Sequence, residues 1–124
     1  MKKLSEYSVK EILAEDPYTL VTLFSQEYDF EIPEMIDSVD DLKNAGTIIG
    51  KLASAYSYLV QLSVYAKIDV RNAKKNKEDK AKIDDAIDRK AVIDAFVDSV
   101  DMKYKAVSRM LTIKQQINEE LKFL

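Results

Sequence analysis

Apolar residues recur at alternating spacings of three and four along two long stretches of the chain, a pattern typical of helices that pack along a common seam. The first seam comprises Leu42, Ala45, Ile49, Leu52, Tyr56, Leu59, Ser63, Ala66, Val70 and Ala73. The second comprises Ile83, Ala86, Lys90, Ile93, Val97, Val100, Tyr104, Val107 and Leu111. Ser38 supplies an N-cap before the first stretch. The pattern therefore predicts two long helices, at about 38–75 and 80–122.

The linker between the two predicted helices, residues 74–80, contains no apolar residue. Folding the chain about Lys77 brings Leu59 opposite Val97, and the two seams then match along their length. This agreement predicts an antiparallel helical hairpin with its seam residues, Tyr56 and Tyr104 included, in the core. A single continuous helix is the alternative, because the linker lacks the Gly and Pro that commonly end helices.

Residues 1–37 are predicted to form a separate arm with short helices. The segment Ser8–Glu11 has the spacing of a capping box, which predicts a short helix from about Val9 to Ala14. Pro17 would end it, and the apolar-rich stretch from Tyr18 to Tyr28 would form a second helix before an extended link at 29–33. At 124 residues, arm and hairpin (38–124) are expected to share one all-α domain.

Composition agrees with a helical chain and limits the chemistry available to it. Only 2 Gly and 2 Pro are present, too few for the turns of an all-β domain. The chain has no Cys and no His, which excludes disulfides, thiolate metal sites and histidine-dependent catalysis. Carboxylate pairs such as Asp94 and Asp98 alternate with basic residues, so surface ion pairing is favoured over a magnesium site. We expect no catalytic residue, no metal and no cofactor.

The apolar surface exceeds what one hairpin can cover, since Val64, Ile87, Met102 and other large residues flank the seams. This predicts a homo-oligomer of helices. Gly46 and Gly50, continued by Ala53, Ser54 and Ser57, form a face of small residues that would let two backbones approach closely. The alternative is a tight contact of this face with the arm of the same chain.

The charges divide the chain into an acidic arm and a basic body. Residues 1–41 hold 3 basic and 11 acidic residues, while residues 42–124 hold 16 basic and 11 acidic residues. Such asymmetry is a hint of a nucleic-acid or other charged partner. The alternatives are that the basic residues form a solvated surface, or that the acidic arm folds over the basic body and masks it.

Two sets of residues are candidates for binding. Basic residues near the hairpin turn and on the second helix would contact the phosphates of single-stranded nucleic acid. They are Lys67, Arg71, Lys74, Lys75, Lys105, Arg109 and Lys114. Acidic and aromatic residues of the arm would contact a protein. They are Phe24, Tyr28, Asp29, Phe30, Glu31 and Glu34.

No signal peptide is evident, because no apolar segment follows the lysines at the N-terminus. The longest uncharged stretch, Leu52 to Ala66, has 15 residues and falls short of the roughly 20 that a membrane span needs. The chain is therefore expected to be cytoplasmic and to have no membrane partner.

Segments of the predicted helices resemble known bacteriophage proteins. The stretch 104–114, closing in 118–121, resembles the end of small helical proteins of tailed bacteriophages. Residues 35–38 leading into Leu42, followed by 51–59, are similar to the T4-type recombination mediators over about 40 residues. That resemblance implies a ring-forming helical protein that binds single-stranded DNA and loads a recombinase in the host cytoplasm. The acidic, aromatic arm departs from that family.

Two functions follow as hypotheses. In the first, the protein is a non-enzymatic, oligomeric accessory factor that binds single-stranded nucleic acid in phage replication or recombination. In the second, it binds and inhibits or sequesters a phage or host protein, with its acidic arm imitating nucleic acid towards a basic partner. A structural component of the virion is a third possibility that the sequence leaves open.

Overall fold

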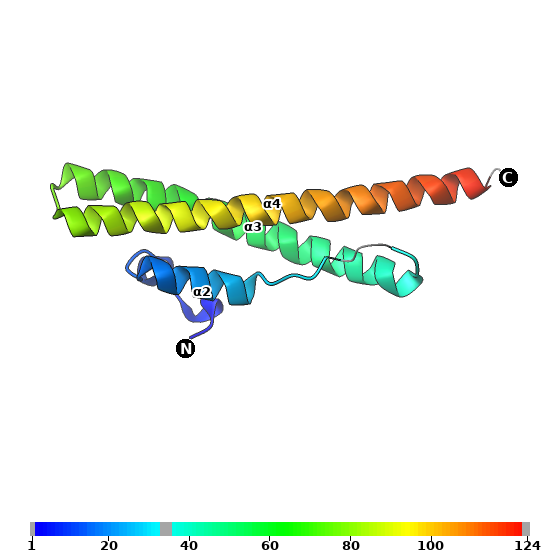
Figure 1. Ribbon diagram of the computed structural model, residues 1–124, viewed down its shortest axis with the longest axis horizontal. Coiled ribbons are helices and arrows are strands. Elements are labelled where there is room, and N and C mark those ends of the chain that lie inside the picture. Colours follow the sequence, from blue (N-terminus) through cyan, green and yellow to red (C-terminus); the bar gives the residue numbers. More distant parts are fainter. Residues whose placement is uncertain (1, 33–35, 123–124) are drawn as a thin grey trace.

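Two long helices form an antiparallel hairpin in the computed structural model, which describes residues 2–32 and 36–122 (Figure 1). Helix α3 spans Val39–Lys75 and helix α4 spans Lys80–Lys122, and the two pack against each other. Ser38 caps α3 by accepting a hydrogen bond from the Asp41 amide at 3.1 Å. Neither described range contains a strand, and the predicted all-α hairpin is confirmed.

The arm forms three short elements before the hairpin. A 3-10 turn, η1, covers Leu4–Glu6, helix α1 covers Val9–Ile12, and helix α2 covers Pro17–Glu27. The expected capping box at the start of α1 is present, with both Ser8–Glu11 hydrogen bonds formed. Pro17 is the first residue of α2, where its fixed φ suits a helix start.

The chain reverses direction at Lys77, which adopts a left-handed conformation with φ 52°. The Lys77 amide donates to the Lys74 carbonyl at 3.2 Å, and the Glu78 amide donates to the Ala73 carbonyl at 3.1 Å. These two bonds make a Schellman motif, which ends α3. Asp79 then caps α4 by accepting from the Lys82 amide at 2.9 Å. The alternative of one continuous helix is therefore wrong.

The hairpin core repeats every seven residues along both helices. The buried seam positions are Ala45, Leu52, Leu59, Ala66 and Ala73 on α3, and Ala86, Ile93, Val100 and Val107 on α4. The alternate seam positions lie at the edge of this contact. Tyr56 and Tyr104 are 40% and 37% exposed, so the prediction that they are core residues is wrong. The heptad position of Leu59 and Ile93 is therefore more deeply buried than the alternate seam position.

The two polar residues of the seam share one partner, Asp94, which Ser63 reaches from across the hairpin and Lys90 from the same helix. The Ser63 hydroxyl donates to the carboxylate of Asp94, and the ammonium of Lys90 donates to the same carboxylate. A buried polar group needs such a partner to avoid a desolvation penalty. The contact between Ser63 and Asp94 agrees with the register obtained by folding the chain about Lys77.

Helix α2 packs against α4, and the arm lies beside the half of α4 that is nearer the hairpin turn (Figure 1). The ring of Phe24 meets that of Phe96 edge to face, with centroids 5.4 Å apart. The guanidinium of Arg89 donates to the Glu15 carbonyl at 3.2 Å and lies 3.6 Å from the Asp69 carboxylate. Arg89 thus ties α4 to both the arm and α3. Over residues 2–32 and 36–122, no helix is long and apolar enough to span a membrane.

Candidate functional site

Many basic side chains gather at the hairpin end, which we define as residues 67–82. It holds seven basic and three acidic residues. Lys67, Arg71 and Lys74 lie on successive turns of α3, with Lys75 next to them, and all four side chains are exposed. Ion pairs within 4.0 Å are absent from these four residues across the described ranges. Four of the predicted nucleic-acid contacts therefore lie together with their charges unneutralised.

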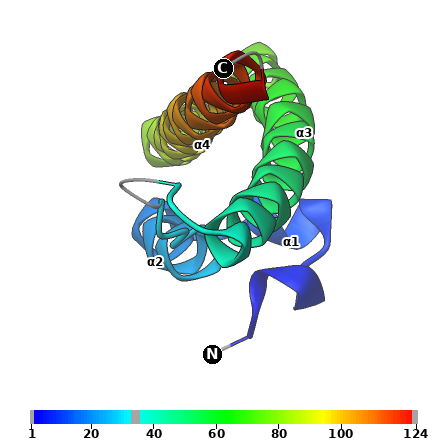
Figure 2. The same cartoon turned by 90° about the vertical axis from the view of Figure 1, so that its right-hand side faces the viewer.

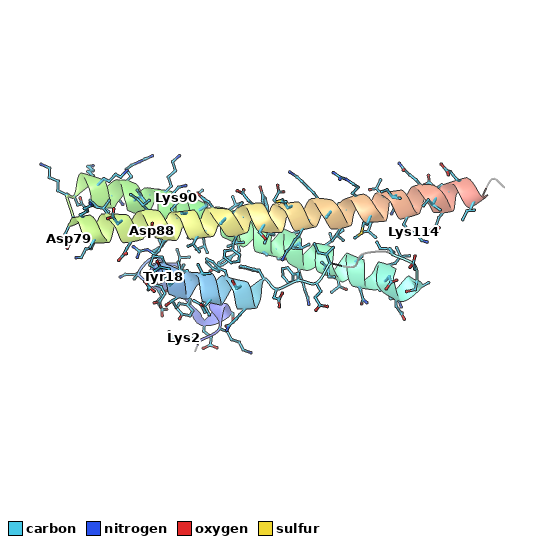
Figure 3. The ribbon with its side chains drawn as sticks, viewed as in Figure 1. Lys2, Tyr18, Asp79, Asp88, Lys90 and Lys114 are labelled. Atoms are coloured by element: carbon cyan, nitrogen blue, oxygen red, sulfur yellow. The ribbon has the colours of Figure 1, made fainter. Side chains whose placement is uncertain are left out.

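Two of the three acids of the hairpin end have partners other than the basic residues of α3. Asp69 lies beside the guanidinium of Arg89, and Asp79 accepts the amide that begins α4. Glu78 is exposed next to the turn. Figure 3 shows Asp79 at the turn and Asp88 and Lys90 further along α4. The positive charge of the outer α3 residues is therefore not cancelled by direct pairing.

The second predicted basic cluster, Lys105, Arg109 and Lys114, has less unpaired positive charge than the sequence suggested. Lys105 pairs with Asp101 one turn earlier, with 2.9 Å between Nζ and Oδ2, and the hydrogen bond to Asp101 raises the pKa of Lys105. Arg109 is exposed and Lys114 is half-buried. The i, i+4 spacing of Asp101 and Lys105 could have revealed this pair from the sequence.

The two basic clusters do not form one surface. Lys105 lies 25 residues beyond Lys80 on the same helix, which corresponds to roughly 38 Å at about 1.5 Å per residue. The structure therefore brings together Lys67, Arg71, Lys74 and Lys75, and it places Lys105, Arg109 and Lys114 well away from them towards the C-terminal end of α4.

Two of the predicted protein-binding residues are packed inside the chain. Phe24 is 0% exposed and Tyr28 is 8% exposed, and their rings stack with centroids 6.0 Å apart. Burial raises the pKa of Tyr28. Asp29 and Glu31 are exposed and Phe30 is half-buried, so these three remain accessible after the arm has docked. Glu34 lies outside the described residues.

The arm does not cover the basic residues through charge pairing. Its one ion pair in the described part of the chain joins Lys2 to Glu11 at 2.8 Å, within the arm itself. That contact, together with the capping bonds from Ser8, lowers the pKa of Glu11 to about 2. The arm is instead held by aromatic packing and by Arg89, and Lys67, Arg71, Lys74 and Lys75 stay exposed.

A groove that sequence analysis missed runs between the arm and the first half of α3. It has a volume of about 780 Å³, and the rings of Tyr7, Tyr28, Phe30 and Tyr58 line it. Lys51 and Glu27 supply charges at its walls. Burial raises the pKa of Tyr58. The groove depends on where the arm docks, which local periodicity does not encode.

Two carboxylates of α4 form ion pairs with bases of the same helix. Asp94 pairs with Lys90 and Asp101 pairs with Lys105. Within the described ranges, no group of three or more acidic side chains is placed to hold a metal ion. The comparisons add no further assignment, because no protein-family model, no curated protein and no solved structure matches this chain.

Proposed function

We propose that the protein is a non-enzymatic accessory factor of phage DNA replication or recombination, and that it binds single-stranded nucleic acid through the hairpin end. The observation that carries this proposal is the exposed, unpaired group of Lys67, Arg71, Lys74 and Lys75 on α3. The resemblance to T4-type recombination mediators supports it from the sequence.

The physical basis of this binding is the release of counterions from the phosphate backbone. Each phosphate that a Lys or Arg neutralises steepens the fall of affinity with salt, by about 0.7 in the logarithmic slope for a single strand. Successive turns of α3 place positive side chains about 5.4 Å apart along a straight line. Four such residues would give a slope of about −3 if each meets one phosphate.

The test is fluorescence anisotropy with a labelled single-stranded oligonucleotide over a salt series. We expect steep salt dependence for the natural chain, and a loss of affinity of more than tenfold for a variant combining Lys67→Glu, Arg71→Glu and Lys75→Glu. The matched control combines Lys105→Glu with Arg109→Glu, which reverses the charge of the second cluster. Because all five positions are exposed, circular dichroism should show unchanged helix content.

Two outcomes would contradict this function. If the natural chain shows no binding at low salt, the hairpin end is solvated surface. If the control variant loses as much affinity as the hairpin-end variant, the interaction depends on total charge rather than on the hairpin end.

A second candidate function is binding of a protein partner at the arm. The observation that favours it is the aromatic groove of about 780 Å³ beside Phe30, with Asp29 and Glu31 exposed near it. Its volume and apolar lining fall within the range of ligand-binding clefts. A partner captured by the natural chain but lost with Asp29→Lys and Glu31→Lys, while oligonucleotide affinity is unchanged or raised, would support this function over the first.

A further inference from the structure

The face of α3 opposite its buried seam carries a second regular stripe. Its members recur at spacings of three and four, as they would in a helix-to-helix contact. We call them the outer stripe: Gly46, Gly50, Ala53, Ser57, Val60, Val64 and Ile68. All are exposed except Val60, which is half-buried. At about 1.5 Å per residue the stripe is roughly 33 Å long.

No part of the chain packs closely on the ends of this stripe. A Cβ atom added at Gly46 or at Gly50 would have no neighbour within 4 Å, so the expected alternative of a tight contact with the arm is not found at these two residues. Gly50 lines the open groove between the arm and α3 without touching the arm closely. At the other end, Val64 is 54% exposed and Ile68 is 43% exposed. In Figure 2, α4 and α2 lie on the same side of α3, and the opposite flank of its green part is open.

The outer stripe is graded in size along the helix. Its first four members are Gly, Gly, Ala and Ser, while its last three are Val, Val and Ile. If two copies of α3 cross antiparallel with their Ser57 residues meeting, Gly46 lies opposite Ile68 and Gly50 lies opposite Val64. Each bulky side chain then enters a space left by a glycine, which allows close approach of the backbones. A parallel arrangement would set bulky residues against each other.

The charges at the two ends of α3 favour the same direction. The helix start has Asp37, Asp40 and Asp41, with Lys43 as the one base, and the helix end has Arg71, Lys74 and Lys75. Antiparallel crossing brings the acidic start of each copy near the basic end of the other. It also opposes the two helix dipoles, which is the favourable arrangement.

We propose that the outer stripe docks a second copy of this chain, with the two α3 helices antiparallel and Ser57 at the two-fold axis. The contact is isologous, because the same stripe is used by both copies. The outer stripe itself contains none of the basic residues of the hairpin end, but the antiparallel contact places Arg71, Lys74 and Lys75 near the acidic helix start of the other copy.

The chain has no cysteine, so single cysteines report proximity without background. With a mild oxidant, Ser57→Cys should form a disulfide-linked dimer. A mixture of Gly50→Cys and Val64→Cys chains should give the mixed dimer, and neither of these variants should link to itself efficiently. Self-linked Gly50→Cys as the main product would overturn the antiparallel arrangement, because it requires the two residues numbered 50 to meet.

A second measurement separates association from folding. Gly46→Gln adds a side chain in open space within the chain, so the monomer should become more stable to urea because Gly is a poor helix former. The same side chain would occupy the space for Ile68 of the other copy, so sedimentation equilibrium should show dimerisation weakened at least tenfold. Ala91→Gln, at an exposed position of α4, is the matched control and should leave dimerisation unchanged. A natural chain that sediments only as a monomer, or a Gly46→Gln variant that dimerises normally, would overturn the proposal.

Discussion

The hairpin and the arm bury comparable kinds of residue but distribute them differently. The hairpin buries one seam side chain per heptad on each long helix, such as Leu59 and Ile93, over a long contact, and α3 buries Ala55 and Leu62 in addition. The arm concentrates its burial around one place, where Phe24 meets Phe96 and where Ile12 and Leu20 are fully buried. A distributed core makes every layer part of one cooperative unit, whereas a concentrated core allows the arm to separate as a unit of its own.

Phe24→Ala should produce the largest difference in stability between the arm and the hairpin. Removing a fully buried Phe side chain costs about 3–5 kcal/mol, and here the loss falls on the docking of the arm. We expect residues 4–27 to lose protection from hydrogen exchange, while amides in the middle of α3 and α4 remain protected. Mass spectrometry of exchanged peptides from the full chain measures both regions at once.

Ile93→Ala provides the matched change in the hairpin. Truncation of this fully buried residue costs about 2–5 kcal/mol and should lower protection throughout both long helices. If Phe24→Ala instead exposes the arm and the hairpin to the same degree, then arm and hairpin form one cooperative unit and the comparison fails.

The hairpin could be predicted because its information is local and repeated. Heptad spacing, the Ser38 cap and an apolar-free linker each point to the same element, and the matched seams give the pairing. The sequence did not reveal which of the two seam positions would be more fully buried. Tyr56 and Tyr104 therefore emerged at the edge of the contact, since that depends on the rotation of each helix about its axis.

The placement of the arm could not be predicted, because it depends on contacts between residues far apart in the sequence. Charge offered the alternative that the acidic arm lies on basic residues, but the arm is held through Phe24 and through Arg89, whose guanidinium donates to a backbone carbonyl. Composition contains no information on such a contact. The groove lined by Tyr28 and Tyr58 went unnoticed for the same reason.

Lys77→Gly should stabilise the hairpin without affecting the opening of the arm. The left-handed conformation of Lys77 costs a non-glycine residue about 1–2 kcal/mol, and glycine would remove this cost. Part of the gain in stability is lost, because glycine has more conformational freedom in the unfolded chain. We expect a net stabilisation of about 0.5–1 kcal/mol, seen as a higher urea midpoint with an unchanged slope. Hydrogen exchange should slow in the hairpin, and arm opening should be unaffected.

Asn76→Gly is the control for that substitution. Asn76 has φ −80°, which any residue adopts easily, so glycine there brings no relief and should leave the chain equally stable or less stable. Equal stabilisation by both glycines would show that the turn as a whole is strained, rather than the left-handed residue alone.

The smallest effect should come from pH, and it should be confined to the arm. The bonds from Lys2 and Ser8 hold the pKa of Glu11 at about 2 instead of 4.5. As pH falls, the Glu11 carboxylate is therefore protonated in the unfolded arm before it is protonated in the folded arm. The stability contributed by Glu11 is therefore complete above pH 4.5 and is lost as pH falls towards 2. Glu11→Gln should remove this part of the pH dependence of exchange in α1, while Glu6→Gln should preserve it. Because Lys2 and Glu11 are both about half exposed, added salt should weaken the effect as well. A pH dependence in the arm that Glu11→Gln leaves intact would place its origin in another carboxylate.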